Sequence, residues 1–141
     1  MNRSICQFAL FAAIALVLVG CASVSGTTLK IDAWNVEGRR HVPDELTYML
    51  GELGYGWVPV VDPSSHLRVK TAQSDDEFRM RFEFLETRQV RIDVRIGRLD
   101  GVTWLHFHEP GSQTLSPSSI DLLNKLKARA ALEFGAANIS H

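Results

Sequence analysis

This sequence predicts an α+β domain: one mostly antiparallel sheet of four to six strands, with two helices packed on one of its faces, after a cleaved signal peptide. Two observations support this fold class. Several segments alternate apolar and polar residues with a period of two, as half-buried strands do. Two other segments carry an apolar stripe with a helical period, one near each end of the domain.

The chain starts with a segment typical of a secretory signal. An apolar run over 5–19 follows Arg3 and is shorter than the ~20 apolar residues that span a bilayer. The run ends in Leu18-Val19-Gly20-Cys21, which resembles the lipobox of bacterial lipoproteins. The resemblance implies cleavage after Gly20 and lipid on the Cys21 sulfur, and Ala22 at the next position favours the outer membrane. A plain membrane anchor with an incidental Cys is the alternative.

The predicted domains follow from this start. Residues 1–20 form the signal peptide, 21–27 the lipidated Cys and its tether, 28–135 a single domain, and 136–141 a frayed tail. Cleavage leaves 141 − 20 = 121 residues with 14 basic and 16 acidic side chains, because only Arg3 is lost. The resulting charge of 14 − 16 = −2 does not favour a nucleic-acid partner. Cys6 leaves with the signal and Cys21 takes lipid, so we expect no disulfide.

The domain begins with a strand and a helix. Alternation around Leu29 and Ile31 predicts a strand at about 28–36. Pro43 and the two acidic residues after it favour a helix start, and Gly54 favours a left-handed end, so a helix is expected over 43–53.

Shorter strands come next. Residues 57–61 predict a brief strand at an edge or a bulge, because Pro59 lacks the N–H that a sheet interior needs. Alternation over 67–71 predicts a second strand.

The clearest pattern is a long hairpin over 77–84 and 90–96. Pairing Phe84 with Val90 places all the apolar residues of both strands on one face. The same register sets Arg81 opposite Asp93 and Glu83 opposite Arg91, which are complementary pairs. It also sets Arg79 opposite Arg95, which is a like-charge pair.

The last elements are a strand and a long helix. Asp100-Gly101 turns the chain into a strand over 102–108, and Ser116-Pro117 supplies a cap and a first-turn Pro for a helix over 117–134. This layout resembles small bacterial outer-membrane lipoproteins, including the lipopolysaccharide-assembly lipoproteins. Cys21, Leu53-Gly54-Tyr55 and His66-Leu67-Arg68-Val69 carry the resemblance, with His66 where an acidic residue is common. The resemblance implies a binding or assembly role.

Candidate partner-binding residues lie on the face opposite the helices. Arginine and tryptophan dominate binding hot spots and arginine also recognises phosphate, so a predicted face that carries both is a candidate surface for a protein or glycolipid of the envelope. A solvated sheet face is the alternative. The candidates are Trp34, Arg79, Arg81, Arg91, Arg95 and Trp104.

Two further patterns bear on chemistry. His106 and His108 are two apart on a strand and could share a metal, with Glu109 or His66 as a third ligand, although exposed histidines are the ordinary interpretation. The 39–41 segment, Arg-Arg-His, could receive an anion or be a solvated loop. No Gly-x-Ser-x-Gly elbow is present. We therefore expect no enzyme and no cofactor, but a non-enzymatic envelope lipoprotein, with a small periplasmic metal-binding protein as the alternative.

Overall fold

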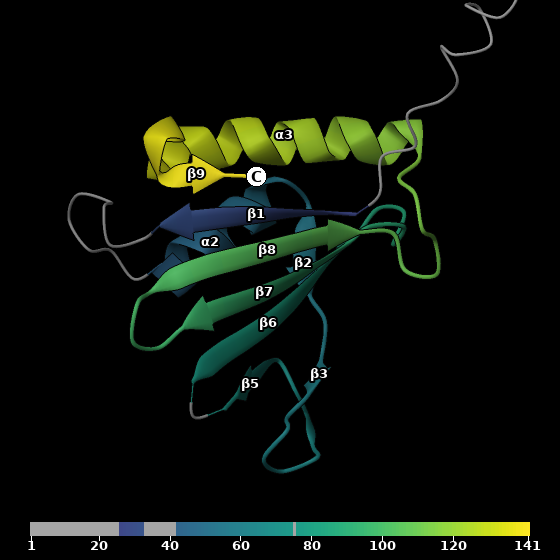
Figure 1. The fold of residues 1–141 in the computed structure, drawn as a ribbon. Helices are drawn as coiled ribbons and strands as arrows, with labels where there is room; N and C mark the ends of the chain where they lie inside the picture. The colour runs from purple at the N-terminus through teal and green to yellow at the C-terminus, as the bar shows by residue number, and fades with distance from the viewer. Residues whose placement is uncertain (1–25, 33–41, 75) are drawn as a thin grey trace, which may run out of the picture.

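The protein has the α+β architecture that its sequence predicts (Figure 1). The computed structural model describes residues 26–32, 42–74 and 76–141. Within these residues, a seven-stranded antiparallel sheet carries two helices, and a second sheet has two strands. The elements are β1 (Thr27–Asp32), α2 (Val42–Glu52), β2 (Tyr55–Trp57), β3 (Val60–Val61), β4 (Arg68–Val69), β5 (Thr71–Gln73), β6 (Glu77–Phe84), β7 (Arg91–Gly97), β8 (Val102–His108), α3 (Pro117–Phe134), the 3₁₀ helix η2 (Ala136–Asn138) and β9 (Ile139–Ser140).

The large sheet has the order β2-β6-β7-β8-β1-β9, and β5 also pairs with β6. The predicted hairpin register is confirmed: Arg81 faces Asp93, and the N–H of Phe84 donates to the carbonyl of Val90 at 3.0 Å. Arg79 lies opposite Arg95, as expected. The alternation of apolar and charged residues therefore determines which side chains occupy each face of β6 and β7.

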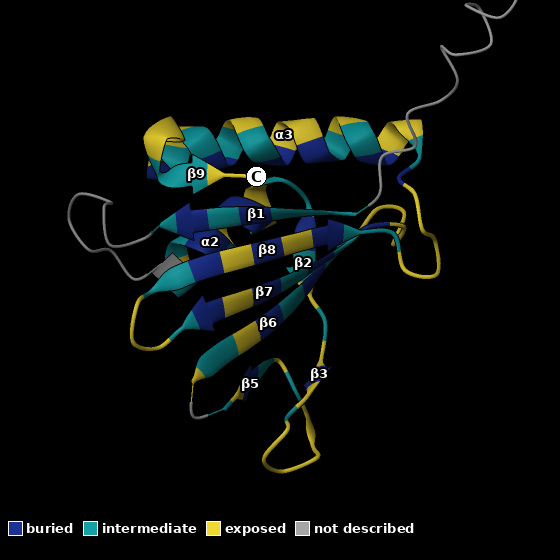
Figure 2. Cartoon of the chain, viewed as in Figure 1, coloured by how far each residue is buried: buried dark blue, intermediate teal, exposed yellow. Residues whose placement is uncertain are grey.

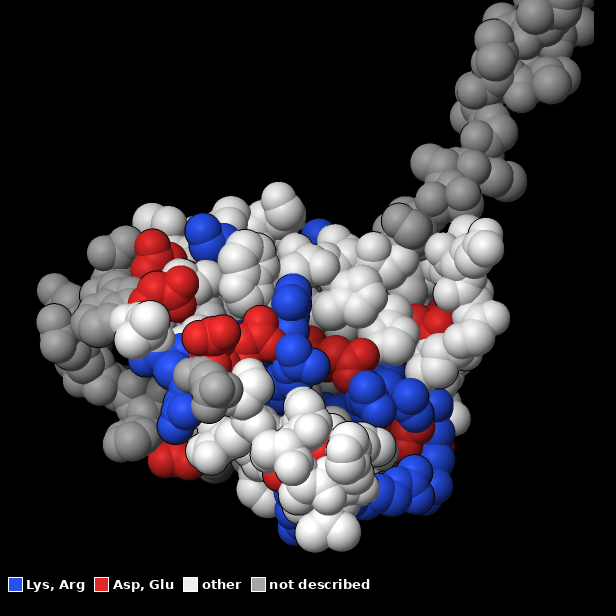
Figure 3. Space-filling model, turned by 60° about the horizontal axis from the view of Figure 1, so that its bottom comes forward, with Lys and Arg blue, Asp and Glu red and all other residues white. Residues whose placement is uncertain are grey.

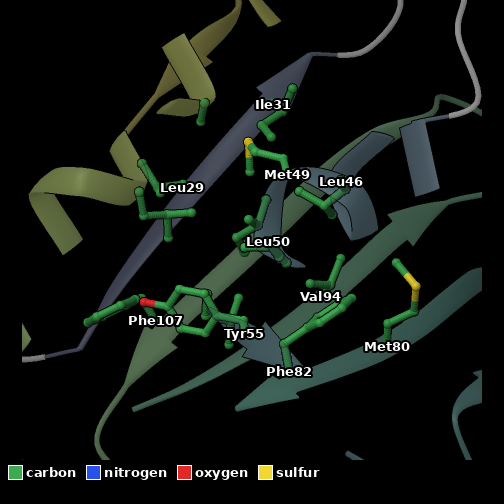
Figure 4. Close-up of a cluster of buried hydrophobic side chains, with 14 of the residues drawn as sticks. Leu29, Ile31, Leu46, Met49, Leu50, Tyr55, Met80, Phe82, Val94 and Phe107 are labelled. Atoms are coloured by element: carbon green, nitrogen blue, oxygen red, sulfur yellow. The ribbon is translucent and has the colours of Figure 1, made fainter. Parts of the chain in front are cut away.

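One face of the sheet, the inner face, packs against both helices (Figure 2). Its side chains come from alternate positions of β1, β6, β7 and β8, and they meet Leu46, Met49 and Leu50 of α2 (Figure 4). The buried face of α3 adds Leu123 and Leu126. The members from these four strands are Leu29, Ile31, Met80, Phe82, Ile92, Val94, Ile96, Leu105 and Phe107.

Both helices form where they are expected. The predicted helix over 43–53 is α2, and Gly54 directly after its last turn has a φ of 89°, a left-handed conformation that glycine adopts without a steric penalty. The predicted helix over 117–134 is α3, and the N–H of Ser119 donates to the Ser116 side chain at its start. Within the described residues, no helix combines the length and the apolar character needed to cross a membrane.

The segment around Pro59 differs from the prediction. The single strand expected over 57–61 is divided into β2 and β3, and the strand expected over 67–71 is divided into β4 and β5. The Val58 N–H still donates to the Arg81 carbonyl at 2.9 Å. Because Pro59 has no N–H to donate, the chain then leaves the large sheet, forms the β3–β4 hairpin and returns to the edge of β6 as β5.

The structure also differs from the prediction at the two ends of the domain. The strand predicted from residue 28 begins one residue earlier, at Thr27, because Thr27 pairs with Phe107; positions 33–36 of that prediction lie outside the described residues. The frayed tail predicted for 136–141 is wrong. Residues 136–138 form η2, and Ile139 pairs with Ile31. The reason is that β1 offers an open edge that the short C-terminal strand fills.

Candidate binding surface on the outer sheet face

The outer face of the sheet, opposite the two helices, holds the predicted partner-binding residues that the structure describes. Charged side chains of both signs are interleaved over the molecular surface (Figure 3). Cys21, Trp34 and the 39–41 segment lie outside the described residues. The outer-face residues discussed below are Thr28, Lys30, Ala72, Glu77, Arg79, Arg81, Glu83, Arg91, Asp93, Arg95, Trp104, His106 and His108.

The four predicted arginines differ in how freely they present their charge. The Arg91 side chain is the most buried, at 28% exposed, and lies 3.8 Å from Glu83. Its Nε atom is buried without a hydrogen-bond partner. Arg79 and Arg95 are 48% and 53% exposed, and both lie near one carboxylate, that of Glu77. Arg79 and Arg95 are therefore the arginines best placed to meet a partner.

Asp93 is the centre of the polar network on this face. Its Oδ1 accepts a hydrogen bond from Arg81 Nε at 2.5 Å, and its Oδ2 lies 2.8 Å from His108 Nε2. Burial acts to raise the pKa of the Asp93 carboxyl, but the hydrogen bonds from Arg81 and His108 outweigh it, so this pKa lies below its ordinary value. Asp93 thus stays ionised and ties β6, β7 and β8 together.

The two histidines lie side by side, as their spacing predicts. Their rings are stacked with centroids 4.9 Å apart, and His106 Nδ1 lies 3.1 Å from Thr28 Oγ1. Burial lowers the pKa of His106, and the neighbouring His108 lowers it further. His106 is therefore neutral at pH 7, with its ring oriented by β1.

Glu109 and His66, the two candidates for a third metal ligand, do not form a metal-binding group with His106 and His108 among the described residues. Glu109 accepts hydrogen bonds from the Ser116 N–H at 2.7 Å and from Ser116 Oγ at 2.6 Å. His66 follows β3 in the turn that leads to β4, with a φ of 57°. Among the described residues, no group of three or more His, Cys, Asp or Glu side chains is arranged to hold a metal.

Glu109 instead has a structural role that the sequence did not reveal. Burial acts to raise the pKa of its carboxyl, but hydrogen bonds from Ser116, Ser119 and Gln89 outweigh this and lower the pKa to about 2. The resulting negative charge lies at the start of α3, where the helix dipole favours it. Glu109 is seven residues before Ser116, so no local capping pattern pointed to it.

Trp104 lies on the outer face as predicted. Its side chain is directly opposite Arg95 on β7 and Lys30 on β1, and Lys30 Nζ is 5.3 Å from its ring centroid. Trp104 is 36% exposed. An aromatic ring between two cations, part covered and part open, is the type of anchor that binding surfaces use.

A pocket of about 310 Å³ lies where β3 packs over the outer face. Ala72 lies opposite Arg79 and therefore on the outer face, yet it is 1% exposed, so the β3 segment covers it. Sequence analysis missed this pocket, because it depends on how the β3–β4 hairpin folds back. Its lining is Val60, Val61, Ala72, Arg79, Met80, Arg81, Asp93, Val94 and Arg95.

Comparison with protein-family models, with curated proteins and with solved structures finds no match to this chain. The geometry of the outer face is therefore the basis for a functional proposal.

Proposed function

We propose that this chain is a non-enzymatic bacterial envelope lipoprotein, anchored through Cys21 at the periplasmic side of the outer membrane. Its outer sheet face binds a protein or glycolipid partner. The anchor is supported by the sequence Leu18-Val19-Gly20-Cys21 at the end of a short apolar run. Two or three acyl chains on one Cys hold a protein at a bilayer without a transmembrane helix.

The observation that carries the binding proposal is the combination of exposed arginine and tryptophan on one rigid sheet. Arg95 and Trp104 lie directly opposite each other on β7 and β8, and Arg79 lies opposite Arg95 on β6. Arginine and tryptophan are the residue types that most often carry binding energy. Strand positions also hold these side chains more rigidly than loops would.

The lipid anchor at Cys21 is close in sequence to one end of the outer face. Gly26, the first described residue, packs against the end of β8: a Cβ added there would be 3.1 Å from His108 Cβ. Cys21 is only five positions before Gly26, so the two residues are at most ~18 Å apart. Lipid on Cys21 would therefore hold the histidine end of the outer face close to the bilayer.

The anchor is tested by metabolic labelling with a fatty-acid analogue. Wild-type protein is expected to take up label and Cys21→Ser is expected to take up none and to keep its signal peptide. Equal labelling of the two proteins would refute the lipoprotein assignment.

The binding face is tested by crosslinking the full chain in intact envelopes. The pair Arg95→Glu with Trp104→Ala is expected to lose the crosslinked partner while the circular dichroism spectrum stays unchanged. The control Lys127→Glu with Leu132→Ala on α3 likewise reverses one positive charge and truncates one large apolar side chain, but away from the sheet, and Leu132 is 81% exposed. Retention of the partner by the Arg95 and Trp104 variant would contradict the proposal, and the 39–41 segment would become the next candidate.

The metal-binding alternative is a separate hypothesis that rests on the stacked His106 and His108 alone. Metal analysis of the purified protein tests it. One equivalent of zinc that is lost in a variant with both histidines replaced by alanine would favour this alternative over the binding proposal.

A further inference from the structure

We propose that the pocket between β3 and the outer face binds a phosphate monoester carried on an apolar group. The inference rests on the proposed function, because it names a ligand class for the same face. The pocket lies between a short strand of the second sheet and the guanidinium groups of the large sheet. Its volume of about 310 Å³ is at the small end of ligand pockets, which suits a head group and the first part of a chain.

The first reason is an excess of positive charge in the lining. Arg79, Arg81 and Arg95 contribute three guanidinium groups, and Asp93 contributes the one carboxylate of the lining, which gives 3 − 1 = +2. Glu77 pairs with Arg79 and Arg95 from outside the lining and lowers this local excess to 3 − 2 = +1. Both oxygens of the Asp93 carboxylate have partners, Arg81 on one side and His108 on the other. A phosphate monoester, with a charge near −2 at pH 7, is attracted by this excess and competes with the Glu77 carboxylate for Arg79 and Arg95 more strongly than a singly charged anion does.

The second reason is the position of the two freest arginines. Arg79 and Arg95 lie directly opposite each other on neighbouring strands, an arrangement that costs stability for like charges. Glu77 is their shared counter-ion, with its carboxylate 2.8 Å from Arg79 but 3.7 Å from Arg95. An anion between the two guanidinium groups would relieve this repulsion and accept paired hydrogen bonds from each of them.

The third reason is that the rest of the pocket lining is apolar. Val60 is 8% exposed and Ala72 is 1% exposed, whereas Val61 is 60% exposed. Val60 and Ala72 are thus buried apolar parts of the lining, and Val61 leaves an apolar surface toward solvent. A ligand with a short apolar group next to its phosphate would cover Val61, which inorganic phosphate could not do.

The test uses the purified full chain in a non-ionic detergent and soluble probes, measured by isothermal titration calorimetry. Hexyl phosphate is expected to bind. Inorganic phosphate, which lacks the apolar part, hexanol, which lacks the anion, and hexyl sulfate, which has a single charge, are each expected to bind at least tenfold more weakly.

Variants locate the site. Arg79→Gln with Arg95→Gln is expected to weaken hexyl phosphate binding at least tenfold with little change in the melting temperature, because the loss of two partly exposed ion pairs with Glu77 is offset by the removal of a like-charge pair. Val61→Asp, which places a negative charge on the apolar part of the lining, is expected to weaken it as well. Lys127→Gln on α3 is the charge-matched control and should leave binding unchanged.

The results that would overturn the inference are specific. If the folded double arginine variant binds hexyl phosphate as tightly as the wild type does, the binding site is not in this pocket. If inorganic phosphate binds as tightly as hexyl phosphate, the apolar group does not contribute to recognition. If hexanol or hexyl sulfate binds as tightly as hexyl phosphate, the pocket does not recognise a phosphate monoester. These measurements need neither lipid on Cys21 nor an envelope partner, so they fail independently of the labelling and crosslinking experiments above.

Discussion

Along β6 and β7, consecutive residues lie on opposite faces of the sheet and meet different surroundings. Phe82 on the inner face is 1% exposed and packs beneath the helices, whereas its neighbour Glu83 is partly exposed and pairs with Arg91 at 3.8 Å. The inner face is stabilised by removal of apolar area from water, and the outer face by hydrogen bonds and ion pairs in partial contact with water.

This difference has a consequence for where function resides. The inner face is used mainly by packing, since its buried side chains form one hydrophobic core with those of α2 and α3. Among the described residues, the β3 segment covers Ala72, and other outer-face side chains such as Arg79 and Arg95 are exposed. Substitutions on the inner face should therefore change stability, while substitutions on the outer face should change binding with small effects on stability.

The largest expected change in stability compares two adjacent residues of β6, one on the inner face and one on the outer face. Phe82→Ala should lower the free energy of unfolding by about 3–5 kcal/mol, because it leaves a cavity under the helices. Glu83→Ala should change it by less than about 0.5 kcal/mol. Urea unfolding followed by circular dichroism measures both, and Phe82→Leu serves as a milder variant if the alanine protein does not fold. Similar losses of unfolding free energy for Phe82→Ala and Glu83→Ala would contradict the proposed difference between the two faces.

The next effect concerns Asp93, the best-connected group on the outer face. Asp93→Asn should lower the free energy of unfolding by about 1 kcal/mol at pH 7, since it weakens hydrogen bonds to Arg81 and His108 in a site that water partly screens. The folded pKa of Asp93 lies below the ordinary 3.8. Its contribution is therefore complete above that value and is lost as the pH falls through the lowered folded pKa.

Urea unfolding at several pH values checks this sign. The difference between wild type and Asp93→Asn should shrink as the pH is lowered from 5 to 3. A difference that grows with acid would show that the pKa of Asp93 is raised rather than lowered in the folded protein.

A smaller change in stability is expected at Tyr55, a buried residue on the inner face. The hydroxyl of Tyr55 is buried without a hydrogen-bond partner, and the residue is 4% exposed beside Phe84. Tyr55→Phe should raise the free energy of unfolding by up to about 1 kcal/mol, because an unpaired buried hydroxyl is costly. Thermal unfolding measures the change, and a clear loss of stability would indicate that this hydroxyl is hydrogen-bonded after all.

The smallest effect separates two arginines of the outer face. Arg95→Gln should change the free energy of unfolding by less than about 0.5 kcal/mol and leave the melting temperature unchanged or slightly raised, because Arg95 faces the like charge of Arg79. Arg81→Gln should lower it, because Arg81 faces Asp93 and is bonded to it. Thermal scans of both variants under the same conditions provide the comparison, and a reversed order would contradict the roles given to these two arginines.

Much of this fold is determined by local sequence patterns. The alternation in 77–84 and 90–96 specified which side chains face inward and which pairs lie opposite, because a slip of one residue would invert a face. The starts and ends of both helices follow from capping residues such as Ser116 and Gly54, which act within a few residues of the helix. The position of Trp104 with His106 and His108 on one face follows from the same period of two.

Other features were decided only by tertiary structure. Pro59 indicated an interruption, but the return of the chain as β5 depends on the open edge of β6, and the C-terminal strand depends on the open edge of β1. The cap from Glu109 and the pocket beneath β3 also join residues that no short-range pattern relates. Periodicity and capping act over a few residues, whereas edges, caps from distant loops and pockets arise when separate segments meet in space.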